Sequence, residues 1–347
     1  RIYQVITPGL PEAFPPLKTA DIRAISLPVP ATPFVGRERE LAEIERLLQD
    51  PDCRLISLVG LGGSGKTRLA IQAAAQVAES DALQAFAHGV YFVGLAAVAS
   101  PEGAITALAD VLQMSFYVQP NSSLSLQAAQ EQLARYLADK EALLVLDNCE
   151  QLVAGEFPGW IADLIAAAPG IQWIATSRER LSLPGEWVLG VGGLSYPGMD
   201  EQEDLLDHAA VQLFVQGARR AGSFDPGAAD WPAIGRICQL LGGIPLGVEM
   251  AAAWTKVLSC QEIVAQLERD LLALIATWRT VPERHRTLRT VFQHSWRLLS
   301  DEERDAFCRL SVFRSGFCRE AAIEVAGVSL FMLGTLIDKS LLHRVSA

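Results

Sequence analysis

The sequence predicts an α/β protein in which a parallel β-sheet is followed by two regions that contain only helices. Short apolar runs alternate with amphipathic segments up to about Pro197, a pattern typical of a parallel sheet with helices on both faces. From Asp204 onward the apolar residues recur at helical spacing. The chain has 347 residues, of which 50% are apolar, so we expect two or three domains with their own cores.

The first segment contains too much proline for a helix or a central strand. Seven prolines fall within residues 1–33, so we expect a linker there that opens with a short strand at residues 2–5. A helix is predicted over residues 37–49, because Ile44 and Leu47 belong to one apolar helical face.

Five strands are predicted for the sheet, each from a short apolar run. They cover residues 55–59, 90–95, 143–147, 171–176 and 187–189. A helix is expected directly after the first strand, over residues 68–75. Another is expected over residues 126–137, where apolar residues are spaced by three and four. We assign residues 34–198 to this first domain.

Four helices are predicted in the second domain, residues 199–279. They cover residues 209–221, 231–241, 245–257 and 260–276. Pro245 suits the first turn of the third helix, where its missing N–H is not needed. The last domain, residues 280–347, is also predicted to be helical. Its clearest signal is a capping box, Ser300 with Glu303, that begins a helix.

The run from Gly60 to Thr67 is the clearest functional motif. It matches G-x-x-x-x-G-K-[ST] and lies between the first strand and its helix, as a nucleotide-binding P-loop requires. Backbone N–H groups and the helix N-terminus would bind phosphate oxygens. Lys66 would reach the β- and γ-phosphates, and Thr67 would ligate Mg²⁺. The predicted nucleotide-binding residues of this segment are Gly60, Gly62, Gly63, Ser64, Gly65, Lys66, Thr67 and Arg68.

Three further side chains are candidates for catalysis. Asp147 ends the third strand, where P-loop proteins hold a Walker B carboxylate near Mg²⁺; the alternative is a cap for the following loop. The next residue is Asn148, a neutral amide, so Glu150 is the nearest candidate base; the alternative is a solvated acid. Arg178 follows the fourth strand, and its planar fork suits a γ-phosphate; the alternative is a surface arginine.

The overall composition excludes several classes of protein. The net charge is −11 and the chain has no basic run, which speaks against direct binding of nucleic acid. No uncharged apolar stretch approaches the length that spans a bilayer. The six cysteines lack C-x-x-C spacing, so we expect reduced, buried core residues and a cytoplasmic location. The chain begins at Arg1, and we expect it to be part of a larger protein.

Five motifs occur in an order that resembles a known family. They are Val35-Gly36-Arg37-Glu38, the P-loop, Leu146-Asp147-Asn148-Cys149-Glu150, Thr176-Ser177-Arg178-Glu179-Arg180-Leu181 and Gly243-Ile244-Pro245-Leu246. Together they resemble the nucleotide-binding core of the STAND ATPases, the family of NB-ARC proteins, plant resistance proteins and bacterial multidomain regulators. Residues 286–289, 295–296, 298–299, 313 and 337–341 resemble the winged-helix domain that follows this core in bacterial members.

The resemblance implies a fold and a set of binding residues. The fold is an ASCE-type α/β P-loop NTPase with five parallel strands in the order 5-1-4-3-2, followed by a helical domain and a winged-helix domain. The loop of Val35, Gly36 and Arg37 is similar to the family's adenine-contacting loop. Pro245 matches the proline that packs against the adenine, and Arg178 matches the sensor arginine at the γ-phosphate.

The resemblance also implies a function. Members act as switches, in which ADP holds the domains closed and exchange for ATP opens them and permits oligomerisation. We therefore expect ATP or ADP with Mg²⁺ as cofactors and a homo-oligomer on activation. The opening segment is similar to the junction behind a nucleotidyl cyclase or a transcriptional-activator domain. A helical-repeat sensor is expected after the winged helix.

Two features depart from the family pattern. Many members carry two acids in tandem at Walker B, where this chain has Asp147 and Asn148, so we expect slow ATP hydrolysis. The family's closed state uses a winged-helix histidine, and the sequence stops before that position, since His343 lies too early. Two alternatives to the switch stay open. They are a DNA-binding regulator that acts through the winged helix and a processive AAA-type ATPase.

Overall fold

The structure is a computed structural model that describes residues 25–79, 86–98, 100–117, 125–153, 157–198, 204–222, 224–269, 296, 299–313, 316–339 and 341–342. The strand predicted at residues 2–5 lies outside this part of the chain. The same holds for residues 286–289, which contributed to the winged-helix resemblance, and for His343.

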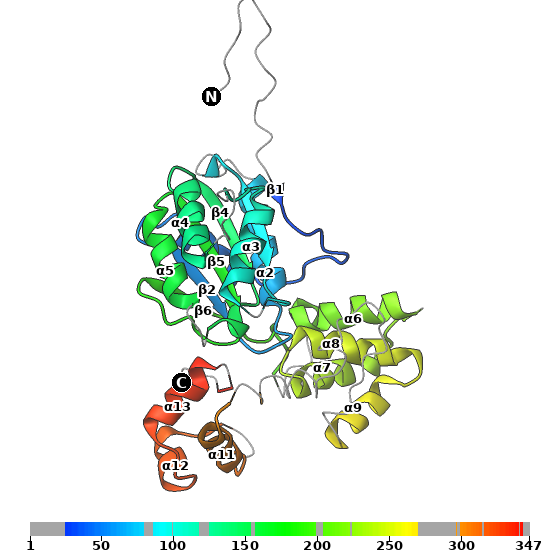
Figure 1. Cartoon of the computed structure of the whole chain (residues 1–347). Helices are drawn as coiled ribbons and strands as arrows, with labels where there is room; N and C mark the ends of the chain where they lie inside the picture. Colours follow the sequence, from blue (N-terminus) through cyan, green and yellow to red (C-terminus); the bar gives the residue numbers. More distant parts are fainter. Residues whose placement is uncertain are drawn as a thin grey trace, which may run out of the picture.

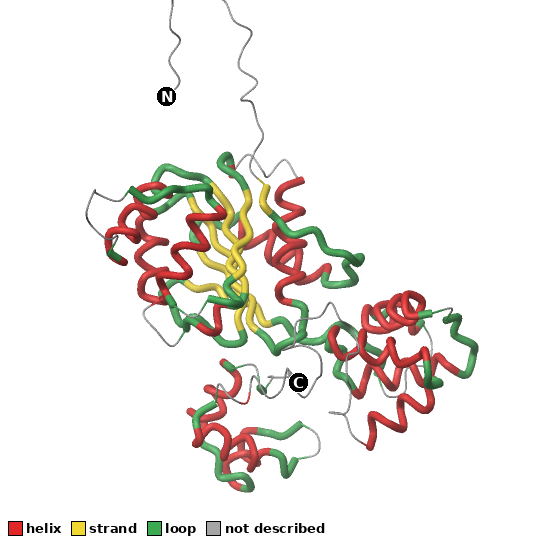
Figure 2. Tube along the Cα trace, turned by 45° about the vertical axis from the view of Figure 1, so that its right-hand side comes forward, coloured by secondary structure: helices red, strands yellow, loops and turns green. Residues whose placement is uncertain are grey.

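A six-stranded, fully parallel sheet forms the centre of the first part of the chain (Figures 1 and 2). Its strands are β1 (Ile25–Ser26), β2 (Leu55–Val59), β3 (Val90–Gly94), β4 (Ala142–Asp147), β5 (Ile171–Ser177) and β6 (Glu186–Gly190). Neighbouring strands follow the order β1-β3-β4-β5-β2-β6. In β4, Leu143 and Val145 pack on one face and Leu144 and Leu146 on the other, because successive strand side chains point to opposite faces.

The prediction of five strands in the order 5-1-4-3-2 was wrong in strand number. A sixth strand, β1, pairs with β3 at the edge of the sheet, so the order of the whole sheet differs from the predicted one. β1 has only two residues and therefore carries no periodic pattern that could reveal it. The five predicted strands all form, and they keep their predicted neighbours among themselves once each number is raised by one.

Helices cover both faces of the sheet (Figure 1). α1 (Glu38–Leu48) and α2 (Lys66–Glu79) share a core with one face. α3 (Pro101–Val111), α4 (Leu126–Leu137) and α5 (Phe157–Ala167) share a core with the other. The sequence analysis did not identify α3 or α5. Both contain few polar residues, so the contrast between apolar and polar faces that marks a surface helix is weak.

A second group of helices packs around a separate apolar core. It consists of α6 (Ala209–Ala221), α7 (Asp230–Leu240), α8 (Pro245–Ala253) and α9 (Cys260–Arg269). The four predicted helices therefore form. α8 is shorter than expected, because the chain changes into the 3-10 turn η4 (Trp254–Lys256). Residues 270–276 of the fourth predicted helix lie outside the described part.

A third group of helices, near the C-terminal end, has its own small core. It contains α11 (Asp301–Leu310), α12 (Arg319–Glu324) and α13 (Leu330–Asp338). The predicted capping box is confirmed, since Glu303 N donates to Ser300 Oγ at 3.2 Å and Ser300 N donates to Glu303 Oε2 at 2.7 Å. The described residues between 299 and 342 form no strand, so the winged-helix assignment stays a prediction.

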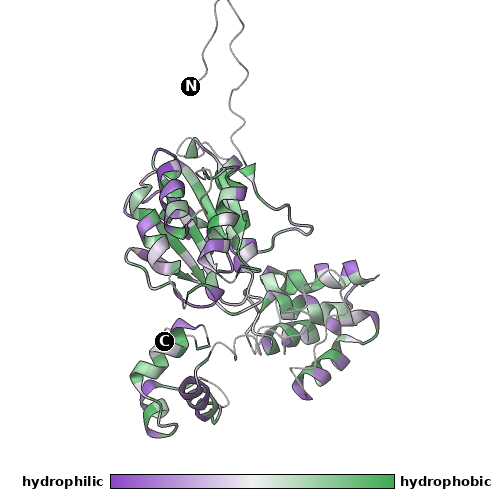
Figure 3. Ribbon diagram, in the orientation of Figure 1, coloured by the Kyte–Doolittle hydropathy of each residue, from purple (hydrophilic) through white to green (hydrophobic). Residues whose placement is uncertain are grey.

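The distribution of hydrophobic residues follows this layered arrangement. Figure 3 shows hydrophobic colouring along the central strands and on the inner sides of the surrounding helices. Of the six cysteines, four are buried as expected, whereas Cys308 and Cys318 are exposed. Within the described part of the chain, no helix combines the length and the hydropathy needed to cross a bilayer.

Candidate functional site

The P-loop connects β2 to α2 and is tightly curved. Gly63 and Gly65 have φ angles of +80° and +96°, which glycine adopts at little cost. Lys66 begins α2 and turns back over the loop, where its Nζ donates to Gly60 O at 2.7 Å and to Leu61 O at 3.0 Å. Burial lowers the pKa of Lys66 to about 8, against the opposing effect of nearby Glu150. A desolvated cation is therefore held at the centre of the loop.

Asp147 lies at the carboxyl end of β4 and joins three elements. Its Oδ1 accepts hydrogen bonds from Thr67 Oγ1 in α2 and from Thr176 Oγ1 in β5, both at 2.6 Å. Burial raises the pKa of Asp147, and the hydrogen bonds from Thr176 and Thr67 oppose the shift. Its carboxylate thus binds side chains from α2 and β5, which disfavours the alternative of a simple loop cap.

Thr67 and Asp147 are therefore brought together, as a magnesium site requires, although the ligand role of each stays a prediction. The role of Thr176 was missed in the sequence analysis, which placed it only at a strand end. Its hydroxyl also accepts from Asn148 N at 3.0 Å, and Asn148 adopts a left-handed φ of 65° that asparagine tolerates. The sequence offered one signal for this role, a hydroxyl residue at the end of β5. Because β5 lies between β4 and β2, that residue is next to the ends of both neighbouring strands.

Glu150 and Arg178 form a buried ion pair. Arg178 Nε donates to Glu150 Oε1 at 3.3 Å, and Asn148 Nδ2 donates to the same oxygen at 3.2 Å. The two paired side chains are only 7% and 4% exposed. The alternatives of a solvated acid and a surface arginine are therefore wrong. Glu150 Oε2 is buried and has no hydrogen-bond partner within the described residues.

The loop before α1 approaches the P-loop from the side. Arg37, at a φ of 74°, donates to Ser64 O at 3.0 Å and to Gly192 O at 2.6 Å. It also pairs with Glu40. Gly36 has a φ of +66°, and a Cβ there would lie 2.6 Å from the Cβ of Ala209 in α6. The predicted adenine loop thus contacts both the P-loop and the second helical group.

The N-terminus of α8 also contacts the P-loop. Leu246 N donates to Gly63 O at 3.2 Å, and a Cβ at Gly65 would lie 3.7 Å from Pro245 Cγ. A cavity of about 60 Å³ lies between these elements. Its lining includes Val35, Arg37, Ser64, Gly65, Arg68 and Pro245. Three predicted binding segments that are distant in the sequence therefore border one space.

Arg68, the residue after Thr67, reaches the segment that precedes the adenine loop. Its guanidinium donates to Thr32 Oγ1 at 2.7 Å, to Thr32 O at 2.6 Å and to Pro33 O at 2.9 Å. The sequence analysis predicted Arg68 as a nucleotide contact but not this connection. The long arginine side chain thus fixes the chain entering the domain to the first turn of α2.

The residues at this edge of the sheet fit a magnesium nucleoside phosphate. Ser64 Oγ and Arg68 Nε, like Glu150 Oε2, are buried and unpaired within the described residues. Mg²⁺ commonly takes one or two protein ligands and completes its coordination with water and phosphate oxygens. No cluster of three or more His, Cys, Asp or Glu side chains suited to a metal occurs in the described part of the chain.

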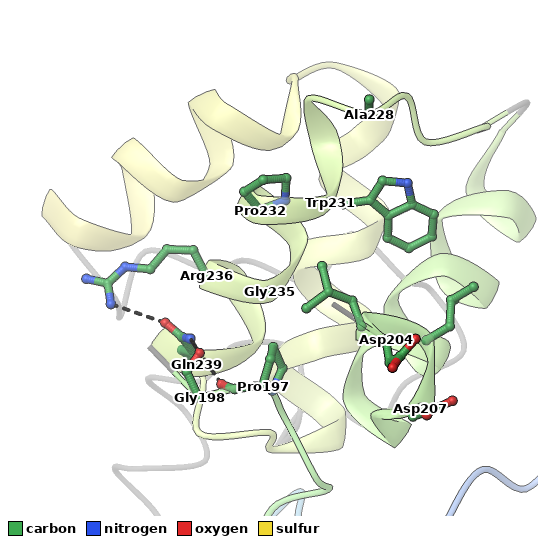
Figure 4. Close-up of a pocket in the computed structure, with 12 residues that line it drawn as sticks. Pro197, Gly198, Asp204, Asp207, Ala228, Trp231, Pro232, Gly235, Arg236 and Gln239 are labelled. Carbon is green, nitrogen blue, oxygen red and sulfur yellow. Dashed lines mark hydrogen bonds between the residues drawn. The ribbon is translucent and has the colours of Figure 1, made fainter. Parts of the chain in front are cut away.

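A second cavity, of about 680 Å³, lies within the second helical group (Figure 4). It is bordered by α7 and by the segment around Asp204, and its lining includes Trp231 and Arg236. Arg236 NH1 donates to Gln239 Oε1 at 3.5 Å, and Gln239 donates to Pro197 O at 3.0 Å. None of the predicted site residues lines this cavity.

Comparisons with known proteins agree with the P-loop geometry. The AAA ATPase domain family matches residues 33–169. An uncharacterized protein of Mycobacterium tuberculosis is 35% identical over 292 residues, which cover 84% of this chain and 68% of that protein. A second protein of that organism, named as an HTH-type transcriptional regulator, is 34% identical over 299 residues, covering 83% of this chain and 31% of its own length.

One solved structure with a similar fold is the Walker-type ATPase of Pyrococcus abyssi. The alignment covers 88% of this chain and 89% of that one, with a TM-score of 0.51 and 13% identity. At this identity the likeness concerns the fold, a parallel α/β P-loop sheet with helices.

Proposed function

Since the chain belongs to the family of that uncharacterized mycobacterial protein and carries an AAA-type ATPase domain, we propose that it is an adenine-nucleotide-dependent switch with slow ATP hydrolysis. One observation carries this proposal. The P-loop residues Lys66 and Thr67, the strand-end acid Asp147 and the pair of Glu150 with Arg178 meet at one edge of the sheet. This constellation suits phosphate binding and γ-phosphate sensing.

Binding relies on the loop and its lysine. Backbone N–H groups at the start of α2 point to where phosphate oxygens would lie, and the helix dipole favours negative charge there. Lys66 would exchange the carbonyls of Gly60 and Leu61 for phosphate oxygens. Thr67 and Asp147 would hold Mg²⁺, which when bound neutralises charge on the β- and γ-phosphates.

Slow turnover follows from the surroundings of Glu150. A general base must be free to accept a proton from the attacking water. One oxygen of Glu150 accepts hydrogen bonds from Arg178 and Asn148 and is therefore not available to the attacking water. In our proposal only the second, buried oxygen of Glu150 is left to accept that proton, so we expect slow turnover.

The switch itself depends on where α8 and the adenine loop meet the P-loop. The cavity of about 60 Å³ is far smaller than the ~300–1,000 Å³ common for ligand sites, so nucleotide entry requires α8 to move away from the loop. In our proposal ADP favours the closed arrangement through Val35–Arg37 and Pro245. ATP engages Arg178, opens the arrangement and permits homo-oligomerisation.

The segment would serve as the ATPase part of a larger regulator. We infer an effector of nucleotidyl cyclase or transcriptional-activator type before it, a helical-repeat sensor after it, and a cytoplasmic setting. The relative named as an HTH-type transcriptional regulator extends well beyond the matched part. A regulatory domain outside this segment is therefore consistent with that name, and direct DNA binding by this acidic chain is not part of the proposal.

The experiment that tests the proposal is nucleotide binding by a Lys66→Ala variant. Removing the cation from the P-loop should weaken ADP and ATP by about 100-fold or more, since hydrogen bonds to charged groups contribute about 1.5–3 kcal/mol each. Calorimetry provides the affinities, and Lys256→Ala, on η4, is the matched control. Unchanged affinity in Lys66→Ala would overturn the site, and rapid steady-state hydrolysis by the unaltered chain would favour a processive ATPase.

A further inference from the structure

The cavity beside the P-loop contains an acid that the phosphate chemistry does not use. Its other lining residues are neutral, apart from the cations Arg37 and Arg68. Glu249, on α8, is the one carboxylate among the described lining residues. A carboxylate repels phosphates, so its presence at a nucleotide site calls for a different interaction partner.

The position of Glu249 is fixed by the same helix that contacts the P-loop. Glu249 lies four residues after Pro245, so both side chains occupy one face of α8. The first turn of this helix is held by the hydrogen bond from Leu246 N to Gly63 O, 3.2 Å long. The helix therefore presents the carboxylate one turn further from the loop than the proline.

Glu249 is a largely buried carboxylate that lies beside an arginine. Its side chain is 20% exposed, and Arg220 NH2 lies 3.7 Å from Glu249 Oε1. Burial raises the pKa of Glu249, and Arg220 and Arg68 offset this shift only in part. Arg68 follows the predicted magnesium ligand Thr67 directly, so Glu249 lies near the end of the phosphate site.

The order of groups along a nucleotide then indicates the partner. Phosphates belong at Ser64 to Thr67, and the apolar part of the cavity, with Phe34, Val35 and Leu213, suits the base. Between them lies the ribose, whose two hydroxyls are hydrogen-bond donors. Carboxylates recognise ribose hydroxyls in dinucleotide-binding folds, and such charge-assisted bonds are stronger than neutral ones.

We propose that Glu249 accepts hydrogen bonds from the ribose hydroxyls and makes the site specific for ribonucleotides. This inference rests on the proposed nucleotide function and extends it to the sugar. Because α8 carries the acid and α2 carries Arg68, the sugar would be held between the second helical group and the sheet domain. Closure of α8 on the nucleotide would then depend on the 2′- and 3′-hydroxyls.

The test compares ADP with 2′-deoxy-ADP and 2′,3′-dideoxy-ADP by calorimetry, all with Mg²⁺, on the unaltered chain and on Glu249→Gln. The unaltered chain should bind ADP about 10- to 100-fold more tightly than the dideoxy analogue, the range for a hydrogen bond to a charged group. In Glu249→Gln the difference should shrink to about threefold or less. Glu268→Gln, which alters an exposed acid paired with Arg236 at 2.9 Å, should keep the full difference.

Each other outcome overturns the inference in a recognisable way. Equal binding of all three nucleotides by the unaltered chain would exclude sugar recognition, whatever the variant does. An equal loss for all three in Glu249→Gln would mean that the acid only holds α8 in place. If Glu249→Gln altered only the preference for ADP over inosine diphosphate, the acid would contact the amino group of adenine and not the sugar. No binding of any nucleotide would overturn the proposed function together with this inference.

Discussion

At the scale of single residues, the site is a set of charges that neutralise one another. Lys66 and Arg178 lie near Asp147 and Glu150. The two acids oppose the lowering of the Lys66 pKa, Lys66 opposes the raising of the Asp147 pKa, and Arg178 donates a hydrogen bond to Glu150. Burial raises the cost of any unpaired charge here. The incoming phosphates would therefore replace existing partners, so that affinity depends on the protonation state of Lys66.

The pH dependence of binding follows from Lys66. Its pKa is lowered by burial to about 8 in the folded chain, so it loses its proton above that pH, and ADP affinity should fall by up to about tenfold per pH unit. The folded chain then binds fewer protons than the unfolded one between about pH 8 and pH 10.5, so the same group makes the free energy of unfolding rise across that window.

Calorimetry with ADP from about pH 7 to about pH 9.5 checks this, alongside chemical unfolding at the same pH values. Lys66→Arg serves as the control, because a guanidinium keeps its charge throughout and should give an affinity that does not change with pH. A flat affinity profile for the unaltered chain would contradict a lowered Lys66 pKa.

At the scale of elements, the sequence predicted what local patterns determine. The five longer strands, the P-loop and the helices α4 and α6 to α8 all carry periodic or motif signals, and they form. The pairing of Glu150 with Arg178 depends on β4 and β5 lying side by side, and spacing along the chain contains no such information. The same applies to Thr176, whose role arises only from its neighbours across the sheet.

The docking of α8 on the P-loop gives a prediction for Gly63→Ala. Gly63 has a φ of +80°, and an added Cβ would lie 2.8 Å from Leu246 Cβ, so α8 must shift away from the loop. Backbone strain of this kind costs about 1–3 kcal/mol, and ADP affinity should fall together with the unfolding free energy. Gly159→Ala, where a Cβ meets nothing within 4 Å, is the matched control. If Gly63→Ala bound ADP and unfolded as the control does, α8 would not be fixed by this contact.

At the scale of the whole molecule, the loop after β5 contacts two different parts of the structure. Arg178 faces the nucleotide site, while Arg180 NH1 lies 3.7 Å from Asp338 Oδ1 in α13. Between them, burial raises the pKa of Glu179, with Lys339 opposing the shift. A rearrangement of Arg178 toward a phosphate would therefore alter the contacts between this loop and the C-terminal helices.

This connection can be measured with charge reversals at Arg180 and Asp338. Each single reversal should loosen α13, and Arg180→Glu with Asp338→Arg should restore the contact. The pair is about half exposed, so the coupling should be only ~0.2–1 kcal/mol. Hydrogen exchange of the α13 amides is the readout, with Arg236→Glu, from a comparably exposed pair, as the control. If the double-mutant cycle gave no coupling energy, this ion pair would not connect the loop after β5 to α13.

The hold of Arg68 on Thr32 and Pro33 has a mechanical consequence. A tension applied to the chain at Ile25 would be resisted first by the two-residue strand β1 at the sheet edge and then by the three hydrogen bonds of Arg68. Because Thr67 precedes Arg68 in the same helical turn, this force would act directly beside the predicted magnesium ligand. The path also runs backward, so a displacement of the first turn of α2 would pull on whatever is attached ahead of residue 25.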